Sequence, residues 1–157
     1  MAYKVLTIDS DFLKKVRDLG IDDLDQPVEY LTAEGGEPCR DVLRRAEKGE
    51  KLILASYCPF KQAGPYREYG PVFVLLHPES SEYDASKLPL PTGSSTDYLA
   101  SCFVVKAYCG NERIVDAKLS SPEAMIADLD AFFSASAVEF VIVRFAAYGC
   151  YSFRVQR

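Results

Sequence analysis

Two phenols, a guanidinium and a carboxylate lie together in a loop between two Gly-Pro dipeptides. Gly64-Pro65 and Gly70-Pro71 bracket the tetrapeptide Tyr66-Arg67-Glu68-Tyr69. Proline restricts its own φ and that of the preceding residue and offers no N–H donor, so these dipeptides resist both helix and strand pairing. Loops held in a fixed shape on a rigid scaffold often carry binding residues. We therefore expect the functional residues to gather at this segment, residues 64–71, which we call the proline loop.

A single arginine interrupts the apolar run at residues 140–145. Arg144 follows residues 140–143, and Glu139 is the nearest charge before it. A guanidinium at the edge of a core needs an anionic or carbonyl partner. We expect Glu68 to be that partner, in an ion pair that holds the proline loop against the sheet. The alternative is that Arg144 converges with Arg40 and Lys106 to form an anion pocket.

The leading functional hypothesis is a small-molecule-binding domain, enzymatic or not, with its pocket at the proline loop. Its ligand is expected to be a small anion or a carboxylated metabolite. The candidate ligand-binding residues are Arg40, Tyr66, Glu68, Tyr69, Lys106 and Arg144. A rival hypothesis is a non-catalytic protein-interaction or dimerisation module, in which the loop and the excursion at residues 78–97 form the surface of a homodimer or of another complex.

Cys39 and His77 suggest a third hypothesis, a cysteine-dependent enzyme. Cys39 lies near an expected helix start and next to Arg40, and a helix N-terminus and a cation both favour the thiolate. His77, the one histidine of the chain, would then act as the general base. The alternative is that Cys39 packs beneath the helix and His77 is a structural residue at a strand end. Cys150, which follows Gly149, is expected to pack at a turn.

The spacing of the five cysteines does not favour a metal site. The closest pair, Cys102 and Cys109, would project from opposite faces of a regular strand, whereas zinc ligands usually come in pairs such as CxxC. We expect free thiols, no metal and no cofactor. The glycine-rich phosphate loops, the GxSxG elbow and the HExxH signature are all missing from the sequence.

Composition favours one ordinary globular domain over residues 1–157. The chain has 48% hydrophobic residues, 26% charged residues and a net charge of −5. The basic residues are dispersed, so we expect no nucleic-acid binding. No apolar run approaches the roughly 20 residues that span a bilayer, and the N-terminus lacks a signal-peptide pattern. A cytoplasmic location without membrane contact is therefore expected.

The hydrophobic pattern predicts three helices and about seven strands. A first helix is expected to be capped by Asp9 or Ser10 and to end at Gly20. A second follows Pro38 with an apolar face of Val42, Leu43 and Ala46, and a third follows Pro122. The expected strands lie at residues 3–8, 52–57, 72–76, 102–109, 113–119, 138–145 and 151–155, and residues 28–31 could add a short edge strand. Gly110-Asn111 is expected to form a hairpin turn.

These elements predict an α+β fold. Several strands are joined by turns too short for a crossover, so one mainly antiparallel sheet of about 6–7 strands with about three helices is expected. A mixed sheet, with parallel pairing around the helix after Pro122, is the alternative.

Several short segments are shared with a known family. They are Pro38-Cys39-Arg40, Gly49-Glu50 before residues 52–57, Pro59-Phe60, the residues from Gly64 to Val74, Val143-Arg144 and Gly149-Cys150-Tyr151. With these the chain resembles an uncharacterised bacterial family, domain of unknown function 1203, from residue 38 to the end. The sequence departs from the family pattern at Pro78-Glu79-Ser80, where a cysteine is common, and at Lys106, where an arginine is common. The resemblance implies a small bacterial domain and no particular activity.

Overall fold

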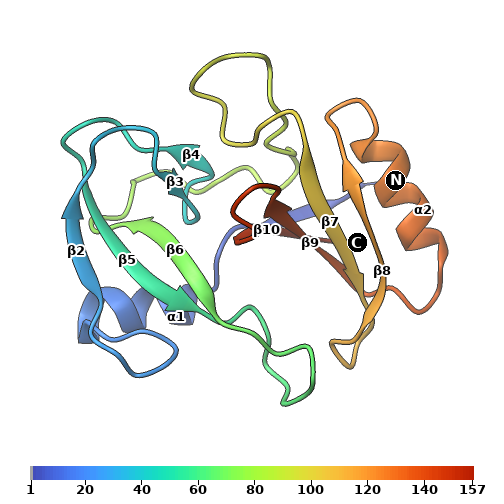
Figure 1. Cartoon of the computed structure of the whole chain (residues 1–157), viewed down its shortest axis with the longest axis horizontal. Helices are drawn as coiled ribbons and strands as arrows, with labels where there is room; N and C mark the ends of the chain where they lie inside the picture. The colour runs from blue at the N-terminus through green and yellow to red at the C-terminus, as the bar shows by residue number, and fades with distance from the viewer. Residues whose placement is uncertain (1) are drawn as a thin grey trace.

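The computed structural model describes residues 2–157, and these form a mainly β structure of two five-stranded sheets and two helical segments (Figure 1). The first helix, α1 (Ser10–Lys14), continues as a π-helical turn, η1 (Lys15–Leu19), and the second is α2 (Met125–Ser134). The strands are β1 (Lys4–Leu6), β2 (Glu29–Thr32), β3 (Pro38–Cys39), β4 (Arg44–Arg45), β5 (Lys51–Tyr57), β6 (Gly70–Leu75), β7 (Phe103–Tyr108), β8 (Ile114–Ser120), β9 (Phe140–Phe145) and β10 (Tyr151–Gln156).

The first sheet has the strand order β1-β10-β9-β7-β8 and is antiparallel throughout. Its central strand, β9, is buried at every position because both of its faces are covered. Val141 and Val143 pack in the same cluster as the apolar side chains of α2, whereas Phe140 and Ile142 pack with β5 and β6 of the other sheet. In Figure 1, α2 lies on the side of this sheet away from β5 and β6. The apolar strand predicted at residues 138–145 is confirmed over residues 140–145.

The second sheet has the order β2-β5-β6-β3-β4. The pair β5 and β6 is antiparallel, and the segment that joins these two strands contains residues 64–69 of the proline loop. Strand β3 runs parallel to β6, with Cys39 opposite Phe73. The sequence-based fold prediction was therefore wrong in its counts: the β content is higher than expected, and the strands divide between two sheets.

The helix predicted after Pro38 is absent from the described residues, and two short strands, β3 and β4, form a hairpin in its place. The backbone N–H of Arg40 donates to the carbonyl of Phe73, which commits this segment to the sheet. Leu43 has φ of 51°, which an α-helix does not allow. The spacing of Val42, Leu43 and Ala46 resembled a helical face, but the hairpin distributes these side chains between separate clusters.

Local signals were more reliable at the two remaining helices and at the hairpin after β7. The side chain of Asp9 accepts a hydrogen bond from the backbone N–H of Asp11 and caps α1, and Gly20 ends the π-helical turn with φ of 66°. Strands β7 and β8 form the expected hairpin, although the residue with positive φ in its turn is Glu112. No helix within residues 2–157 is long and apolar enough to cross a membrane.

Candidate functional site

The proline loop is held at both of its ends. Gly70 and Pro71 already belong to β6, where they lie opposite Tyr57 and Ser56 of β5. Before the loop, the carboxylate of Glu112, from the turn after β7, accepts hydrogen bonds from the backbone N–H of Lys61 at 2.9 and 3.0 Å. The segment that joins β5 to β6 is therefore attached both to its own sheet and to the sheet that contains β7.

Arg144 and Glu68 form the ion pair that the sequence predicted. Nη2 of Arg144 donates to Oε1 of Glu68. The Arg144 side chain is 9% exposed, whereas the Glu68 side chain is 48% exposed. Nη1 of Arg144 also donates to the carbonyl of Gly149 at 3.3 Å, and its Nε is buried without a hydrogen-bond partner in the described part of the chain. A nearly buried cation is thus paired with a carboxylate that water reaches.

A cavity of about 200 Å³ lies next to this ion pair. Three segments line it, and they contribute Tyr57 and Pro59, then Glu68, Tyr69, Gly70 and Pro71, then Arg144, Tyr148, Gly149, Cys150 and Tyr151. The volume is below the roughly 300–1,000 Å³ that is typical for drug-sized ligands. The cavity is therefore of a size for a small metabolite.

A second guanidinium lies behind the cavity. Arg40 is 2% exposed and donates from Nε to the carbonyl of Tyr151 at 2.8 Å and from Nη1 to the carbonyl of Pro38 at 2.7 Å. Its Nη2 lies 3.0 Å from Sγ of Cys150, and its guanidinium carbon lies 5.0 Å from the ring centre of Phe145. Within residues 2–157 Arg40 makes no ion pair. Its buried charge is held by neutral acceptors alone, which is unusual because buried charges are normally paired.

Two tyrosines form the wall of the cavity nearest the core. The rings of Tyr57 and Tyr151 meet edge to face, with their centres 5.1 Å apart. Burial raises the pKa of the Tyr57 phenol and raises the pKa of the Tyr151 phenol well above its ordinary value. Both phenols therefore stay protonated at neutral pH and cannot serve as bases, and the Tyr151 hydroxyl already donates its proton to the carbonyl of Thr7.

The structure brings some of the predicted ligand-binding residues together and separates others. Glu68, Tyr69 and Arg144 line the cavity, and Arg40 touches two of its lining residues from behind. Tyr66 does not line it; the guanidinium of Arg113 lies 5.4 Å from its ring centre instead.

Lys106 also lies outside the cavity lining. It is half-buried on β7, opposite Ile142 of β9 and Ala117 of β8. The alternative of one pocket formed by Arg40, Lys106 and Arg144 is therefore wrong: Arg144 lines the cavity, Arg40 lies behind it and Lys106 lies outside it.

Cys39 and His77 are not joined in the structure. Cys39 is fully buried, and burial raises its pKa to about 12. Its Sγ lies 3.6 Å from the carbonyl of Glu37, and no hydrogen bond to His77 exists within residues 2–157. His77 is exposed at a bend after β6. In the same described range, no three His, Cys, Asp or Glu side chains gather as metal ligands.

Sequence reasoning missed Cys150 and the tyrosines Tyr57, Tyr148 and Tyr151 as parts of the site. The sequence did carry a signal for Cys150. This residue lies between the apolar strand that contains Arg144 and the next apolar strand. A short turn between two antiparallel strands returns the chain beside the residue where it left, here with Tyr151 opposite Arg144. The tyrosines carried no such signal because they look like ordinary core residues.

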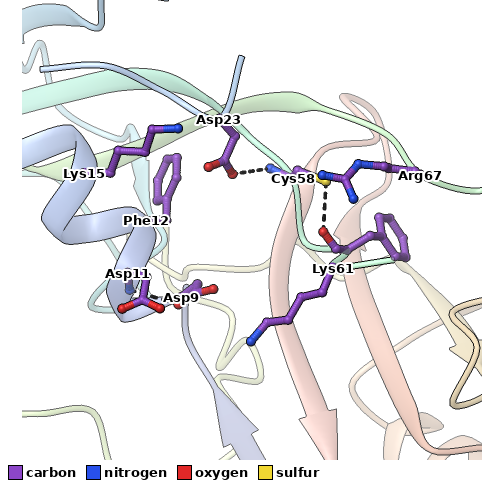
Figure 2. Close-up of a pocket in the computed structure, with 9 residues that line it drawn as sticks. Asp9, Asp11, Phe12, Lys15, Asp23, Cys58, Lys61 and Arg67 are labelled. Atoms are coloured by element: carbon purple, nitrogen blue, oxygen red, sulfur yellow. Dashed lines mark hydrogen bonds between the residues drawn. The ribbon is translucent and has the colours of Figure 1, made fainter. Parts of the chain in front are cut away.

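A second hollow, of about 320 Å³, lies between α1 and the start of the loop after β5 (Figure 2). Three of its charged groups serve the local structure. Asp9 caps α1, Asp23 accepts from the backbone N–H of Cys58 at 2.8 Å, and Lys15 pairs with Asp25 at 3.0 Å. Burial raises the pKa of Asp23. We therefore place the candidate site at the cavity beside Arg144.

Comparison with known proteins bears on the family alone. No curated protein and no solved structure matches this sequence. The family described as "Protein of unknown function (DUF1203)" matches residues 36–157, which include the proline loop, Arg40, Arg144 and Cys150. The match covers well over half of the chain and agrees with the resemblance found in the sequence, so this chain belongs to that family.

Proposed function

We propose that this protein binds a small carboxylate in the cavity between the proline loop and the turn from β9 to β10. The observation that carries the proposal is the charge balance around the cavity. Two nearly buried guanidiniums, Arg40 and Arg144, are matched by one carboxylate, Glu68, which is half exposed. A carboxylate inside the cavity would compensate these cations better than the half-exposed Glu68 does.

The hydrogen bonds of Arg144 support a carboxylate in particular. Nε and Nη2 form one edge of a guanidinium and can bind both oxygens of a carboxylate at once. Glu68 uses one oxygen on Nη2, and Nε has no partner within residues 2–157. A ligand carboxylate in the side-on arrangement would satisfy both donors. Glu68 then acts as an internal substitute that the ligand displaces toward solvent.

The remaining walls suit a compact ligand with few polar groups. The buried phenols of Tyr57 and Tyr151 and the ring of Tyr69 supply aromatic surface. Tyr148, at the tip of the turn, is 91% exposed and can close over a bound molecule. A small aliphatic or keto acid matches both the volume and this lining.

Thermal-shift measurements test the proposal. The probes are the sodium salts of acetate, pyruvate, lactate and succinate, each compared with sodium chloride at equal ionic strength. A ligand at 100 times its Kd stabilises the folded state by about 2.7 kcal/mol, which is about 5–10 °C in Tm for a chain of this size. Glu68→Gln should enlarge the shift because the competing carboxylate is gone. Lys106→Ala removes a cation outside the cavity and should leave the shift unchanged.

Two results would refute carboxylate binding. One is that no probe raises the Tm of the wild-type protein or of Glu68→Gln above the chloride control. The other is that Lys106→Ala abolishes the shift while Arg144→Gln, if folded, preserves it.

The rival hypothesis of an interaction or dimerisation surface stays a prediction. It is favoured by the exposure of Tyr148 together with Tyr66 and Tyr69, which lie 37% and 40% exposed on the proline loop. Sedimentation equilibrium separates the two ideas. A dimer that dissociates in Tyr148→Ala would support the rival, and a monomer at all concentrations would remove dimerisation from consideration.

A further inference from the structure

Strand β8 leaves one edge of the first sheet uncovered. It is the last strand of that sheet, and within residues 2–157 only β7 pairs with it. Residues 115–119 of β8 are all exposed. At the opposite end of the sheet the outer edge of β1 is covered, because the backbone N–H of Val5 donates to the carbonyl of Ala85 at 2.7 Å. An exposed strand edge offers unpaired backbone groups to a further strand.

The backbone groups of β8 that point away from β7 can be identified. In an antiparallel pair, successive residues direct their N–H and C=O groups alternately to one side of the strand and to the other. The N–H of Ala117 donates to the side chain of Asp116 at 2.8 Å, so it points to the open side and not to β7. Leu119, two residues later, has the same orientation. The open edge therefore presents the backbone groups of Ala117 and Leu119.

The sequence of β8 is complementary to itself when a second copy pairs with it in the antiparallel direction. With a twofold axis at Ala117, Asp116 of each copy lies opposite Lys118 of the other, and Val115 lies opposite Leu119. Symmetry makes each of these pairs occur twice. Opposite charges, and apolar side chains, stabilise two strands when they face each other. Val115 and Leu119 are 42% and 65% exposed, so both have apolar surface to bury in such a pair.

The edge strands of the second sheet lack this complementarity. Strand β2 carries one charged residue, Glu29, so the same strand of a second copy offers it no cation. Strand β4 consists of Arg44 and Arg45, and two copies would bring like charges together. A charged residue normally protects an edge strand against pairing, but in β8 the facing charge has the opposite sign. Strand β8 is therefore the edge that fits a second copy of this chain.

We propose that two copies of this protein associate edge to edge through β8, so that their first sheets join into one continuous sheet. The N–H of Ala117 in each copy then donates to the carbonyl of Ala117 in the other, and Asp116 turns to Lys118 of the other copy. The ammonium of Lys118 has three N–H donors, so it keeps its bond to Asp128 at 2.5 Å. The contact lies outside the cavity beside Arg144 and is independent of the proposed function.

Sedimentation equilibrium of the full chain over a wide range of concentrations tests this proposal. The strand gives seven residues from each copy, a contact smaller than the standard interface of about 800 Å² per partner. We therefore expect a weak dimer whose population rises with concentration. Asp116→Lys places like charges opposite each other twice and should weaken dimerisation at least about tenfold. Glu29→Lys makes the same change of charge on β2 and should leave dimerisation unchanged, as should Tyr148→Ala.

A charge exchange between two variants sharpens the test. Asp116→Lys carries two cations on β8 and Lys118→Glu carries two anions, so neither should dimerise alone, whereas an equimolar mixture should form a heterodimer with both pairs restored. Ala117→Pro does not depend on charge or on the bond from Lys118 to Asp128. Proline is tolerated where the N–H of an edge strand points outward, so this variant should fold and should not dimerise.

A disulfide reports the register of the pairing. Residues opposite each other in a hydrogen-bonded antiparallel pair have Cα atoms about 5.5 Å apart, which is within disulfide range. Ala117→Cys should therefore link to its own copy on oxidation, as detected by peptide mass spectrometry. Val115→Cys is the matched control, because its two copies lie about 14 Å apart in this register and should not link.

Two outcomes overturn the proposal. In the first, the wild-type chain stays monomeric at every concentration. In the second, it dimerises, but Asp116→Lys and Ala117→Pro dimerise equally well, which places the interface elsewhere. The thermal shift with carboxylates is measured separately, so the proposed function stands or falls without regard to either outcome.

Discussion

Replacing Glu68 by glutamine should lower the stability of the free protein and increase the stabilisation that a carboxylate provides. The Arg144 side chain is 9% exposed, so loss of its anionic partner leaves a nearly buried charge without an ion pair. Breaking a fully buried pair costs about 3–5 kcal/mol, and an exposed pair is worth about 0–1 kcal/mol. Glu68 is half exposed, and the carbonyl of Gly149 remains as an acceptor. We therefore expect a loss of about 1–2 kcal/mol for Glu68→Gln.

Urea denaturation measures this loss as a lower midpoint at an unchanged m-value. Glu29→Gln is the matched control, because it removes the same charge from the exposed strand β2, where Glu29 makes no ion pair among the described residues. Arg144→Met completes the comparison. It removes the charge and keeps an unbranched apolar side chain, so it should destabilise less than Glu68→Gln. The reasoning is refuted if Glu68→Gln is as stable as wild type while Arg144→Met is strongly destabilised.

Three further changes have defined outcomes. Arg40→Met leaves two buried backbone carbonyls without their donor and should cost about 2–4 kcal/mol in urea denaturation, whereas a loss below 1 kcal/mol would mean that these bonds matter little. Hydrogen bonds from Arg44 lower the pKa of Glu50 to about 2. The stability from this depressed pKa is present above about pH 4.3 and lost as the pH falls toward 2, so Glu50→Gln should lose less Tm than wild type on acidification; equal losses would contradict the assignment. Gly149 has φ of 73° with open space where a Cβ would stand, so Gly149→Ala should cost about 1–2 kcal/mol through backbone strain alone, and an unchanged denaturation midpoint would show that the turn relaxes.

The sequence predicted those parts of the fold that depend on local patterns. The cap at Asp9, the stop at Gly20 and the apolar strand at residues 140–145 follow from side-chain type and period. The helix after Pro38 failed because three apolar residues in a short segment fit a helical face and a tight hairpin equally well. A contact outside the segment favours the hairpin, because the backbone N–H of Arg40 donates to the carbonyl of Phe73 in β6.

The same contrast between local patterns and long-range contacts explains which site residues could be predicted. The pairing of Arg144 with Glu68 could be predicted because a cation in an apolar strand demands a partner and the proline loop offers few. The contact between Arg40 and Cys150 could not, because it joins β3 to the turn after β9 across 110 residues of chain. Contacts of this kind depend on how the two sheets pack together, and neither residue type nor spacing predicts that packing.

Arg144 is proposed to bind the carboxylate of the ligand, and the NMR signal of its side-chain Nε–H tests this binding most directly. In protein labelled with ¹⁵N-arginine, its NMR signal can be assigned by its loss in Arg144→Lys. Titration with pyruvate should move this signal in a saturable way, more strongly in Glu68→Gln, while the signal of Arg40 moves little. A signal of Arg144 that stays fixed while pyruvate, acetate, lactate and succinate are each added to saturation would contradict the claim.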